Sequence, residues 1–383
     1  MRISSKINNA KNAIYSWGPK VAGLIPKSRR IWVYGAWSGR NYSDNPKYMF
    51  EYMCRYHPDI KSVWISRDNH VISKLRNAGF SAYNRLSMGG LYYTLRAGVA
   101  FETAGNEDIS PFINNIKTKT IMMWHGVGGK SSKWKKGQFG TTTKFKFDYF
   151  PASSELYIKI MSEAKNVPQN QFCITGQARD DAFVNSQTFE PLEQIKRKNP
   201  ESKLIVYMPT HRNFGYHENT INIEEIKRVD SFLRENQMIM IFKPHFNELK
   251  FYLSFEENLS NIIIAKDSEW SDPYEYLHYF DLMIGDYSSV MYDFLCADKP
   301  IVLYTYDIDD FIENDANLHD SYWKYPIGPM CNTWDEVFIK ILEANKKDEW
   351  KTQREICKNK FHKFNDGNNC YRIYQWVEEL LDS

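Results

Sequence analysis

The sequence has few cysteines, and none of them stands in a spacing that a cysteine-based site uses. Six occur among 383 residues, and no two form a CxxC pair. This spread argues against a disulfide framework and against a zinc site, so we expect reduced thiols with structural roles. No cluster of Asp and His residues has the spacing of metal ligands either. We therefore expect no metal and no cofactor.

Long hydrophobic runs are also missing. The apolar stretches are too short and too often interrupted to span a bilayer, and no segment has the pattern of a cleaved secretory signal. These absences predict a protein that stays in the cytoplasm.

Acidic residues are absent from the first 30 positions, which contain Arg2, Lys6, Lys11, Lys20, Lys27, Arg29 and Arg30. Apolar residues are interleaved with these cations. The pattern predicts that residues 1–30 form a basic amphipathic segment on an anionic membrane surface, which places the protein peripherally on the inner face of the cell membrane. A solvated, frayed terminus is the alternative.

Net charge does not favour nucleic-acid binding. The formal charge is +2, and the basic residues are not arranged in a familiar recognition module. We expect no nucleic-acid partner.

Short apolar runs alternate with amphipathic stretches along the chain, in two series. This alternation predicts an α/β protein with two doubly wound, Rossmann-like domains that face a cleft. The polar, Lys-rich stretch Pro191 to Ser202 separates the series and is interpreted as a linker. We expect one domain at 31–195 and the other at 203–383, with terminal helices that brace the pair. The expected strands before the linker are 31–36, 62–66, 99–102, 120–124, 149–152 and 172–175, and those after it are 204–208, 238–242, 262–265, 282–285 and 301–304.

Four of the predicted strands end in residues suited to a phosphate ester. They are followed, in chain order, by His125-Gly126 and Lys130, by Thr210 and Arg212, by Lys243-Pro244-His245, and by Ser288-Ser289. Small residues allow backbone N–H groups to approach an anion closely, and a guanidinium binds phosphate through two parallel hydrogen bonds. Because ligands of doubly wound sheets bind at the carboxyl ends of strands, we expect these groups to converge.

Each of these residues also has a plainer interpretation. Serines at the start of a helix are common N-caps, and a predicted helix at 290–297 follows Ser289. His125 has the features of an ordinary half-buried histidine, Arg212 of a cation that pairs with a nearby acid, and Gly128-Gly129 of a turn.

The motifs resemble those of the CDP-glycerol glycerophosphotransferases, which build teichoic acids and related capsule polymers. Trp124-His125-Gly126 with Lys130 resembles the WHGTPLK element, residues 207–212 resemble YxPTxR, and residues 243–245 resemble a basic residue followed by x-His-Pro. The stretch 286–294, DYSSVMYDF, with the KPI at 299–301, is the most specific match, and residues 365–368 resemble a late NDGN segment. Two departures stand out, since Val127-Gly128-Gly129 replaces Thr-Pro-Leu and Phe246 replaces a proline.

The resemblance implies a fold of the GT-B type, a CDP-activated polyol phosphate donor and a peripheral membrane location. It also implies that His125 is the base that deprotonates an acceptor hydroxyl. We expect Gly126, Lys130, Thr210, Arg212, His245, Ser288 and Ser289 to bind substrate, with Asp293 as a donor hydroxyl contact or a support. The predicted reaction moves glycerol phosphate or ribitol phosphate from a CDP-polyol to a hydroxyl of a polymer or lipid-linked acceptor and releases CMP.

A run of lysines follows His125 and contains no acid. The positions are Lys130, Lys133, Lys135, Lys136, Lys144 and Lys146. We expect this run to attract a polyphosphate acceptor or anionic lipid headgroups, and a solvated face is the alternative.

Two further functions remain open at this point. The same fold suits a glycosyltransferase that uses a nucleotide sugar, because fold does not determine the donor. The third possible function is a non-catalytic scaffold bound to the membrane through residues 1–30. The replacement of Thr-Pro-Leu by Val127-Gly128-Gly129 is compatible with it.

Overall fold

The structure is a computed structural model of the whole chain, and its described residues are 23–110, 112–113, 117–126, 148–185, 187–210, 212, 221–314 and 318–382. Three of the expectations above fall wholly or partly outside these ranges. They concern residues 1–22 of the basic segment, the substrate contact of Lys130, and the lysine run to Lys146.

The first half of the described chain folds around a parallel sheet with the order β3-β2-β1-β4-β5, which we call the N-terminal lobe. The strands are β1 (Ser28–Tyr34), β2 (Lys61–Ser66), β3 (Ala82–Asn84), β4 (Ala97–Glu102) and β5 (Lys119–Met122). A parallel pair, β6 (Phe150–Ala152) and β7 (Phe172–Ile174), continues this sheet through a bridge between Tyr149 and Ile121. The covering helices are α2 (Asp44–Tyr56), α3 (Asn69–Asn77), α4 (Met88–Arg96) and α5 (Glu155–Lys165).

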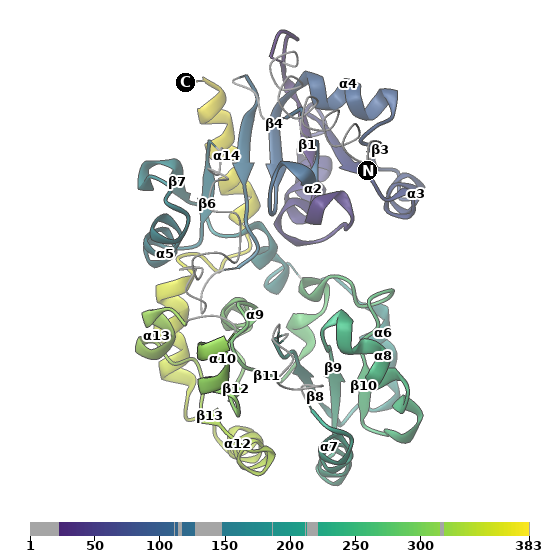
Figure 1. Ribbon diagram of the computed structural model, residues 1–383, viewed down its shortest axis with the longest axis vertical. Helices are drawn as coiled ribbons and strands as arrows, with labels where there is room; N and C mark the ends of the chain where they lie inside the picture. Colours follow the sequence, from purple (N-terminus) through teal and green to yellow (C-terminus); the bar gives the residue numbers. More distant parts are fainter. Residues whose placement is uncertain are drawn as a thin grey trace, which may run out of the picture.

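The second half folds around a parallel sheet with the order β10-β9-β8-β11-β12-β13, which we call the C-terminal lobe. Its strands are β8 (Lys203–Tyr207), β9 (Met238–Phe242), β10 (Ile262–Ile264), β11 (Leu282–Gly285), β12 (Ile301–Tyr304) and β13 (Met330–Cys331). Its longer helices are α6 (Glu190–Lys198), α7 (Ile223–Glu235), α8 (Phe246–Leu253), α10 (Ile308–Asn314), α11 (Asp320–Lys324) and α12 (Trp334–Lys346). The two lobes lie one above the other in Figure 1.

Both sheets have the strand order of a doubly wound Rossmann fold, as the alternating sequence predicted. In such a sheet the order reverses beside the first strand, and a crevice opens there at the carboxyl ends. The reversal lies between β1 and β4 in the N-terminal lobe and between β8 and β11 in the C-terminal lobe. Residues that follow β8 and β11, namely Thr210 and Asp286 to Ser289, therefore lie at a position where this fold binds ligands.

The chain returns to the N-terminal lobe at its end. Helix α13 (Lys351–Phe361) packs near α5, and α14 (Asn369–Asp382) runs upward along the N-terminal lobe (Figure 1). Cys370, Ile373 and Val377 of α14 join the hydrophobic core that contains Trp32 and Phe101. The last two helices thus connect the lobes.

Three local predictions were wrong in detail. The stretch interpreted as a linker forms α6, with Pro191 in its first turn and Leu192 buried in the core beside Leu204. Proline fits there because the first turn needs no N–H donor. The hydropathy pattern also predicts a helix at 274–280, but residues 273–275 and 277–279 form two 3₁₀ turns. The helix expected at 290–297 is a single α-turn, α9 (Val290–Asp293), continued as 3₁₀.

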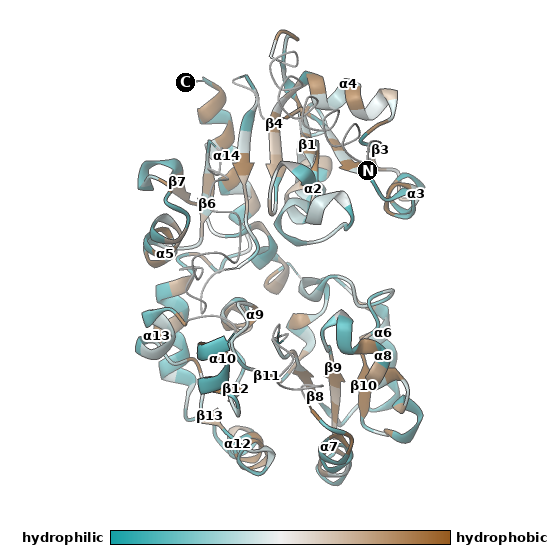
Figure 2. Cartoon of the chain, in the orientation of Figure 1, coloured by the Kyte–Doolittle hydropathy of each residue, from teal (hydrophilic) through white to brown (hydrophobic). Residues whose placement is uncertain are grey.

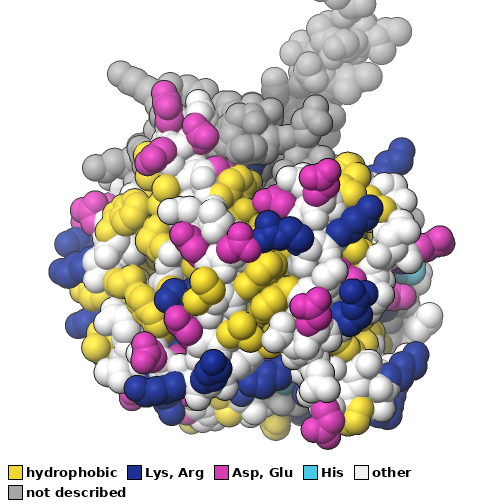
Figure 3. All heavy atoms as spheres, turned by 90° about the horizontal axis from the view of Figure 1, so that it is seen from below, with side chains coloured by type: hydrophobic (Ala, Val, Ile, Leu, Met, Phe, Trp, Pro, Cys, Tyr) yellow, Lys and Arg dark blue, Asp and Glu magenta, His cyan; other side chains and the backbone are white. Residues whose placement is uncertain are grey.

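Hydropathy follows the layers. Strands β9 and β10 are hydrophobic in Figure 2, while α10 and α13 present mostly hydrophilic residues. Seen from below, cationic and acidic side chains are interspersed over the C-terminal lobe (Figure 3), as on an ordinary solvated face. Within the described residues, no helix combines the length and the apolar character that crossing a membrane requires.

Candidate functional site

His125 lies just beyond β5, in contact with two tryptophan rings. Its ring centroid is 4.2 Å from that of Trp124, which is stacked on it, and 4.8 Å from that of Trp37. Burial lowers the pKa of His125 to about 4, and the nearby Asp44 carboxylate opposes this shift. The imidazole is therefore neutral around pH 7 and has a lone pair with which to accept a proton.

The backbone around His125 is strained. Trp37, Ser38, Asp44 and Trp124 all have positive φ, between 49° and 66°, although none of them is glycine. Such conformations persist only where the surroundings enforce them, and they gather at functional sites. Asp108 helps to hold these backbone conformations, because its carboxylate accepts hydrogen bonds from the N–H groups of Ser38 (2.5 Å) and Thr103 (2.7 Å).

Asn45 holds the turn that carries His125. Its side-chain amide donates to the carbonyl oxygen of Trp124 (3.0 Å) and to Oε1 of Gln177 (2.8 Å), and its Oδ1 accepts the N–H of Arg179 (3.1 Å). The hydropathy pattern predicts a helix at 47–56, which leaves Asn45 outside it, whereas α2 begins at Asp44.

Gly126 brings this turn against the C-terminal lobe. A Cβ atom placed on Gly126 would lie 3.0 Å from Oγ and 3.2 Å from Cβ of Ser289, so the glycine is needed for the close approach. Ser288 and Ser289 are both partly exposed. The hydroxyl of Ser289 makes no cap hydrogen bond to α9, so this side chain does not act as the N-cap that the plainer interpretation described. The imidazole turn and the serine turn, predicted from separate lobes, thus meet.

Thr210 and Arg212 belong to a buried network rather than to an open surface. Thr210 donates its N–H (3.0 Å) and its hydroxyl (2.7 Å) to Asp286. Arg212 donates Nη1 to Asp286 (2.8 Å), and Nε (2.6 Å) and Nη2 (2.9 Å) to Asp307. Tyr287 also donates its hydroxyl to Asp307 (3.0 Å). In this structure Arg212 pairs with both carboxylates and fixes the start of the serine turn, which fits the plainer interpretation of this residue, whereas a direct phosphate contact stays a prediction.

His245 follows β9, beside β8, at the edge where the other site residues lie. It is the N-cap of α8, and its Nδ1 accepts the N–H of Asn247 at 3.4 Å. Its ring is partly exposed. The neighbouring Lys243 forms an ion pair with Asp267. Substrate contact by His245 stays a prediction.

Asp293 is fully buried and supports the site from behind. It accepts hydrogen bonds from Nη2 of Arg179 (2.9 Å) and from the hydroxyl of Tyr274 (2.6 Å), and Arg179 also pairs with Asp44 (2.7 Å). Burial raises the pKa of Asp293, and Arg179 counteracts this. Of the two predicted roles for Asp293, this geometry fits support. Arg179 was missed, although an Arg-Asp-Asp run after a strand end offered a signal.

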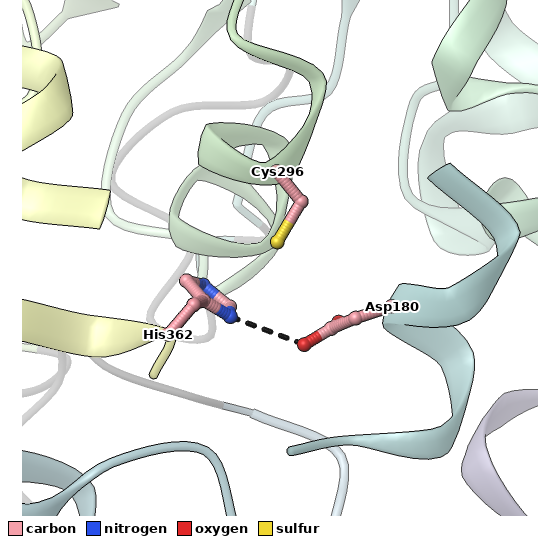
Figure 4. Close-up of side chains that lie close together, drawn as sticks. All are labelled: Asp180, Cys296 and His362. Carbon is pink, nitrogen blue, oxygen red and sulfur yellow. Dashed lines mark hydrogen bonds and ion pairs between the residues drawn. The ribbon is translucent and has the colours of Figure 1, made fainter. Parts of the chain in front are cut away.

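A second buried cluster lies beside this one. Among the described residues, Asp180, Cys296 and His362 form the one group of metal-ligating side chains whose ligand atoms all lie within 4.8 Å of one another (Figure 4). Nδ1 of His362 faces Asp180 at 3.1 Å, and Nε2 faces the carbonyl oxygen of Tyr292 at 2.9 Å.

Because a carbonyl oxygen only accepts, Nε2 of His362 carries a proton, and the carboxylate favours a second proton on Nδ1. Burial alone would lower the pKa of His362, but the Cys296 sulfur and the Asp180 carboxylate outweigh it and raise the pKa well above its usual value. A metal would have to displace the Nδ1 proton and find a fourth ligand. We assign the cluster as a buried ion pair between His362 and Asp180.

Comparisons with known proteins show the family to which this chain belongs. The family model described as CDP-Glycerol:Poly(glycerophosphate) glycerophosphotransferase matches residues 20–379. A teichoic acid poly(glycerol phosphate) polymerase of Bacillus spizizenii is 25% identical over 99% of this chain and 99% of its own. A teichoic acid glycerol-phosphate transferase of Staphylococcus aureus is 24% identical over 94% of this chain and 95% of its own. The chain spans 46% of another such polymerase, from Staphylococcus epidermidis.

Solved structures support the architecture. The wall teichoic acid polymerase TagF superposes with a TM-score of 0.79 at 19% identity, covering 99% of this chain and 98% of that one. At this identity the likeness concerns the fold. It confirms the two-domain, GT-B type arrangement that the sequence predicted.

Proposed function

Since this chain belongs to the family of CDP-glycerol:poly(glycerophosphate) glycerophosphotransferases, we propose that it transfers a polyol phosphate from a CDP-polyol to an acceptor hydroxyl. The oxygen of the acceptor forms a bond to the phosphorus that carries the polyol. The bond from that phosphorus to the bridging oxygen breaks, and CMP leaves with the negative charge. The product is a new phosphodiester on the acceptor.

His125 acts as the base. Its neutral imidazole takes the proton of the acceptor hydroxyl as the new bond forms, and the two tryptophans hold the ring in one orientation. Water is partly excluded there, which strengthens electrostatic interactions with the transferred group.

The serine turn holds the phosphates. Ser288 and Ser289 offer hydroxyl donors, and Gly126 allows the His125 turn to lie directly against them. Arg212 acts as a positioning residue, because it fixes Asp286 and Asp307 and through them the turn. We keep Lys130 and His245 as proposed substrate contacts, and Asp293 with Thr210 as supports.

The acceptor is proposed to be a teichoic-acid-like or capsule polymer, or a lipid-linked precursor, with glycerol phosphate or ribitol phosphate as the transferred group. We assign the acceptor to residues 31–195 and the donor to residues 203–383. We further propose peripheral attachment of residues 1–30 to the inner face of the cell membrane. Cosedimentation of the full chain with vesicles, with and without anionic lipid, tests the attachment, and equal binding to neutral vesicles overturns it.

The contact between Gly126 and Ser289 carries the proposal, because it joins a base from one lobe to an anion-binding turn from the other. The test is incubation with CDP-glycerol, CDP-ribitol and UDP-sugars in the presence of a short polyol-phosphate acceptor, followed by mass analysis. CMP release with acceptor extension is expected. Release of UDP alone indicates a glycosyltransferase.

A variant decides between an enzyme and a scaffold. His125→Ala is expected to lose about two to four orders of magnitude in turnover while it still binds the donor. A scaffold would release no CMP in either form. Full cellular function of His125→Ala would therefore contradict the proposal.

A further inference from the structure

A pocket between the lobes is lined by none of the predicted site residues. It has a volume of about 800 Å³, and its walls come from α2, from the segment after Asp181, from the 3₁₀ turn at 273–275, and from the start of α14. Five tyrosines line it, and we call it the tyrosine pocket: Tyr48, Tyr52, Tyr56, Tyr274 and Tyr371. Its volume lies in the range of small-ligand sites.

Two of these tyrosines are largely open to solvent. Tyr56 is 60% exposed and Tyr371 is 48% exposed, whereas Tyr274 is buried. The rings of Tyr52 and Tyr56, one turn apart on α2, have centroids 5.0 Å apart. Aromatic faces of this kind stack on the C–H surface of a flat ligand. The hydroxyls of Tyr48 and Tyr274 already donate to Asp272 and Asp293.

The charges of the tyrosine pocket disfavour an anion. Its charged lining residues are the carboxylates Glu51, Asp181, Glu275 and Asp366 and the cations Lys47 and Arg55. Lys47 is already committed, because its Nζ pairs with Asp272 at 2.9 Å and with Glu275. Asp366 is likewise paired, with Arg372, and this leaves Glu51 and Asp181 as lining carboxylates without a partner cation of their own among the described residues. A phosphate would therefore meet an excess of negative charge. Side-chain amides of Asn185, Gln187 and Asn368 add neutral donors and acceptors to the wall.

We propose that the tyrosine pocket binds a saccharide, an uncharged polyhydroxyl ligand that stacks on the tyrosine faces and hydrogen-bonds to the carboxylates and amides. Sugar hydroxyls donate to carboxylates, and sugar rings carry the C–H faces that tyrosines prefer. This binding does not depend on the transfer reaction.

The pocket is also connected to the proposed active site. Tyr274 lines it, and the same side chain donates its hydroxyl to Asp293 (2.6 Å) and lies under the guanidinium of Arg179, whose carbon is 4.6 Å from the ring centroid. A ligand that touches Tyr274 on one side and α2 on the other contacts both lobes. Its occupancy therefore favours the arrangement in which the lobes are together.

The test uses the full chain and chitobiose, a neutral disaccharide, measured by saturation-transfer NMR and by calorimetry without donor. Binding is expected, and Tyr56→Ala and Tyr371→Ala should each weaken it about tenfold. Both side chains are exposed, so the fold should survive. Tyr92→Ala, an exposed tyrosine on α4 outside the pocket, is the matched control. His125→Ala should bind chitobiose normally.

Several outcomes overturn the proposal. Absence of saturation transfer to chitobiose does so, and so does an equal loss in Tyr92→Ala. Binding of choline at the same tyrosines without chitobiose would indicate a cage for an organic cation. Displacement of chitobiose by glycerol 3-phosphate, lost in His125→Ala, would show that the sugar occupies the transfer site instead.

Discussion

Arg179 and Asp293 form an ion pair in which Nη2 and Oδ2 are 2.9 Å apart and both side chains are almost completely buried. Arg179 belongs to the segment after β7, and Asp293 ends α9, so the pair joins the lobes. Asp44 completes the arrangement from the start of α2 at 2.7 Å. Tyr274, which lines the tyrosine pocket, donates its hydroxyl to the same Asp293.

Breaking this ion pair should destabilise the protein strongly. Arg179→Met leaves the buried Asp293 and Asp44 without their cation, and a loss of about 3–5 kcal/mol in the free energy of unfolding is expected. Urea denaturation measures it. Arg30→Met is the control, because its pair with Asp59 (2.6 Å) is exposed and should contribute little. Equal midpoints for the two variants would show that the lobes are held together by other contacts.

Sequence periodicity predicted both sheets except for their short edge strands β3 and β13, which were not expected. Strands such as β9, whose five residues are all buried, appear as continuous apolar runs, and the strand order follows from the alternation with helices. Residues 191–202 were misread because a proline and many lysines resemble a linker. A proline in the first helical turn and lysines on an outer face are equally compatible with a helix. In the structure, Leu192 is buried, so α6 packs against the core through this side chain.

The candidate residues that the sequence singled out follow strands, whereas the residues that it overlooked act through contacts distant in sequence. His125 and Ser289 each follow a strand, so topology brings them to one edge. Arg212 was predicted to face a phosphate, but its partners Asp286 and Asp307 lie 74 and 95 residues further along the chain. No local pattern reveals such pairs. Asn45 was overlooked because the helix was expected to begin at Lys47, and Arg179 was overlooked despite the Arg-Asp-Asp run after a strand.

The His362–Asp180 pair should make stability depend on pH. The pKa of His362 is raised in the folded state, so its stabilising effect is complete below the unfolded value of about 6.5 and is lost as pH rises through the raised value. His362→Gln should cost about 1–3 kcal/mol at pH 6, and the difference from wild type should shrink toward alkaline pH. Urea unfolding from pH 6 to 9 measures it.

The wild type and His362→Gln also test whether Asp180 and His362 form an ion pair or whether the cluster with Cys296 binds a metal. Chelator treatment should leave the melting temperature of the wild type unchanged. A rise on addition of Zn²⁺ that His362→Gln abolishes would show that Asp180, Cys296 and His362 bind metal.

Gly126→Ala should impair turnover with little loss of stability. The added methyl group would lie 3.0 Å from Oγ of Ser289, so the two turns must separate by a few tenths of an ångström. Such a displacement between base and phosphate site is expected to lower kcat about tenfold. Gly105→Ala is the matched control, because its Cβ would meet no atom within 4 Å. Equal kcat values for the two variants would mean that this contact is not part of the reaction geometry.

The last prediction concerns the pH at which His125 stops working as a base. Its pKa of about 4 results mainly from burial, so kcat/KM for the free enzyme should stay level from pH 8 to about pH 5 and fall below that. Trp37→Ala removes one of the two covering rings and admits water, which should move the acid limb upward toward the ordinary value of 6.5. The loss of activity should therefore be large at pH 5 and small at pH 8. Trp323→Ala, an exposed tryptophan on α11, should leave the profile unchanged. An acid limb near 6.5 in the wild type, or one that Trp37→Ala does not move, would show that the tryptophans do not set the protonation of His125.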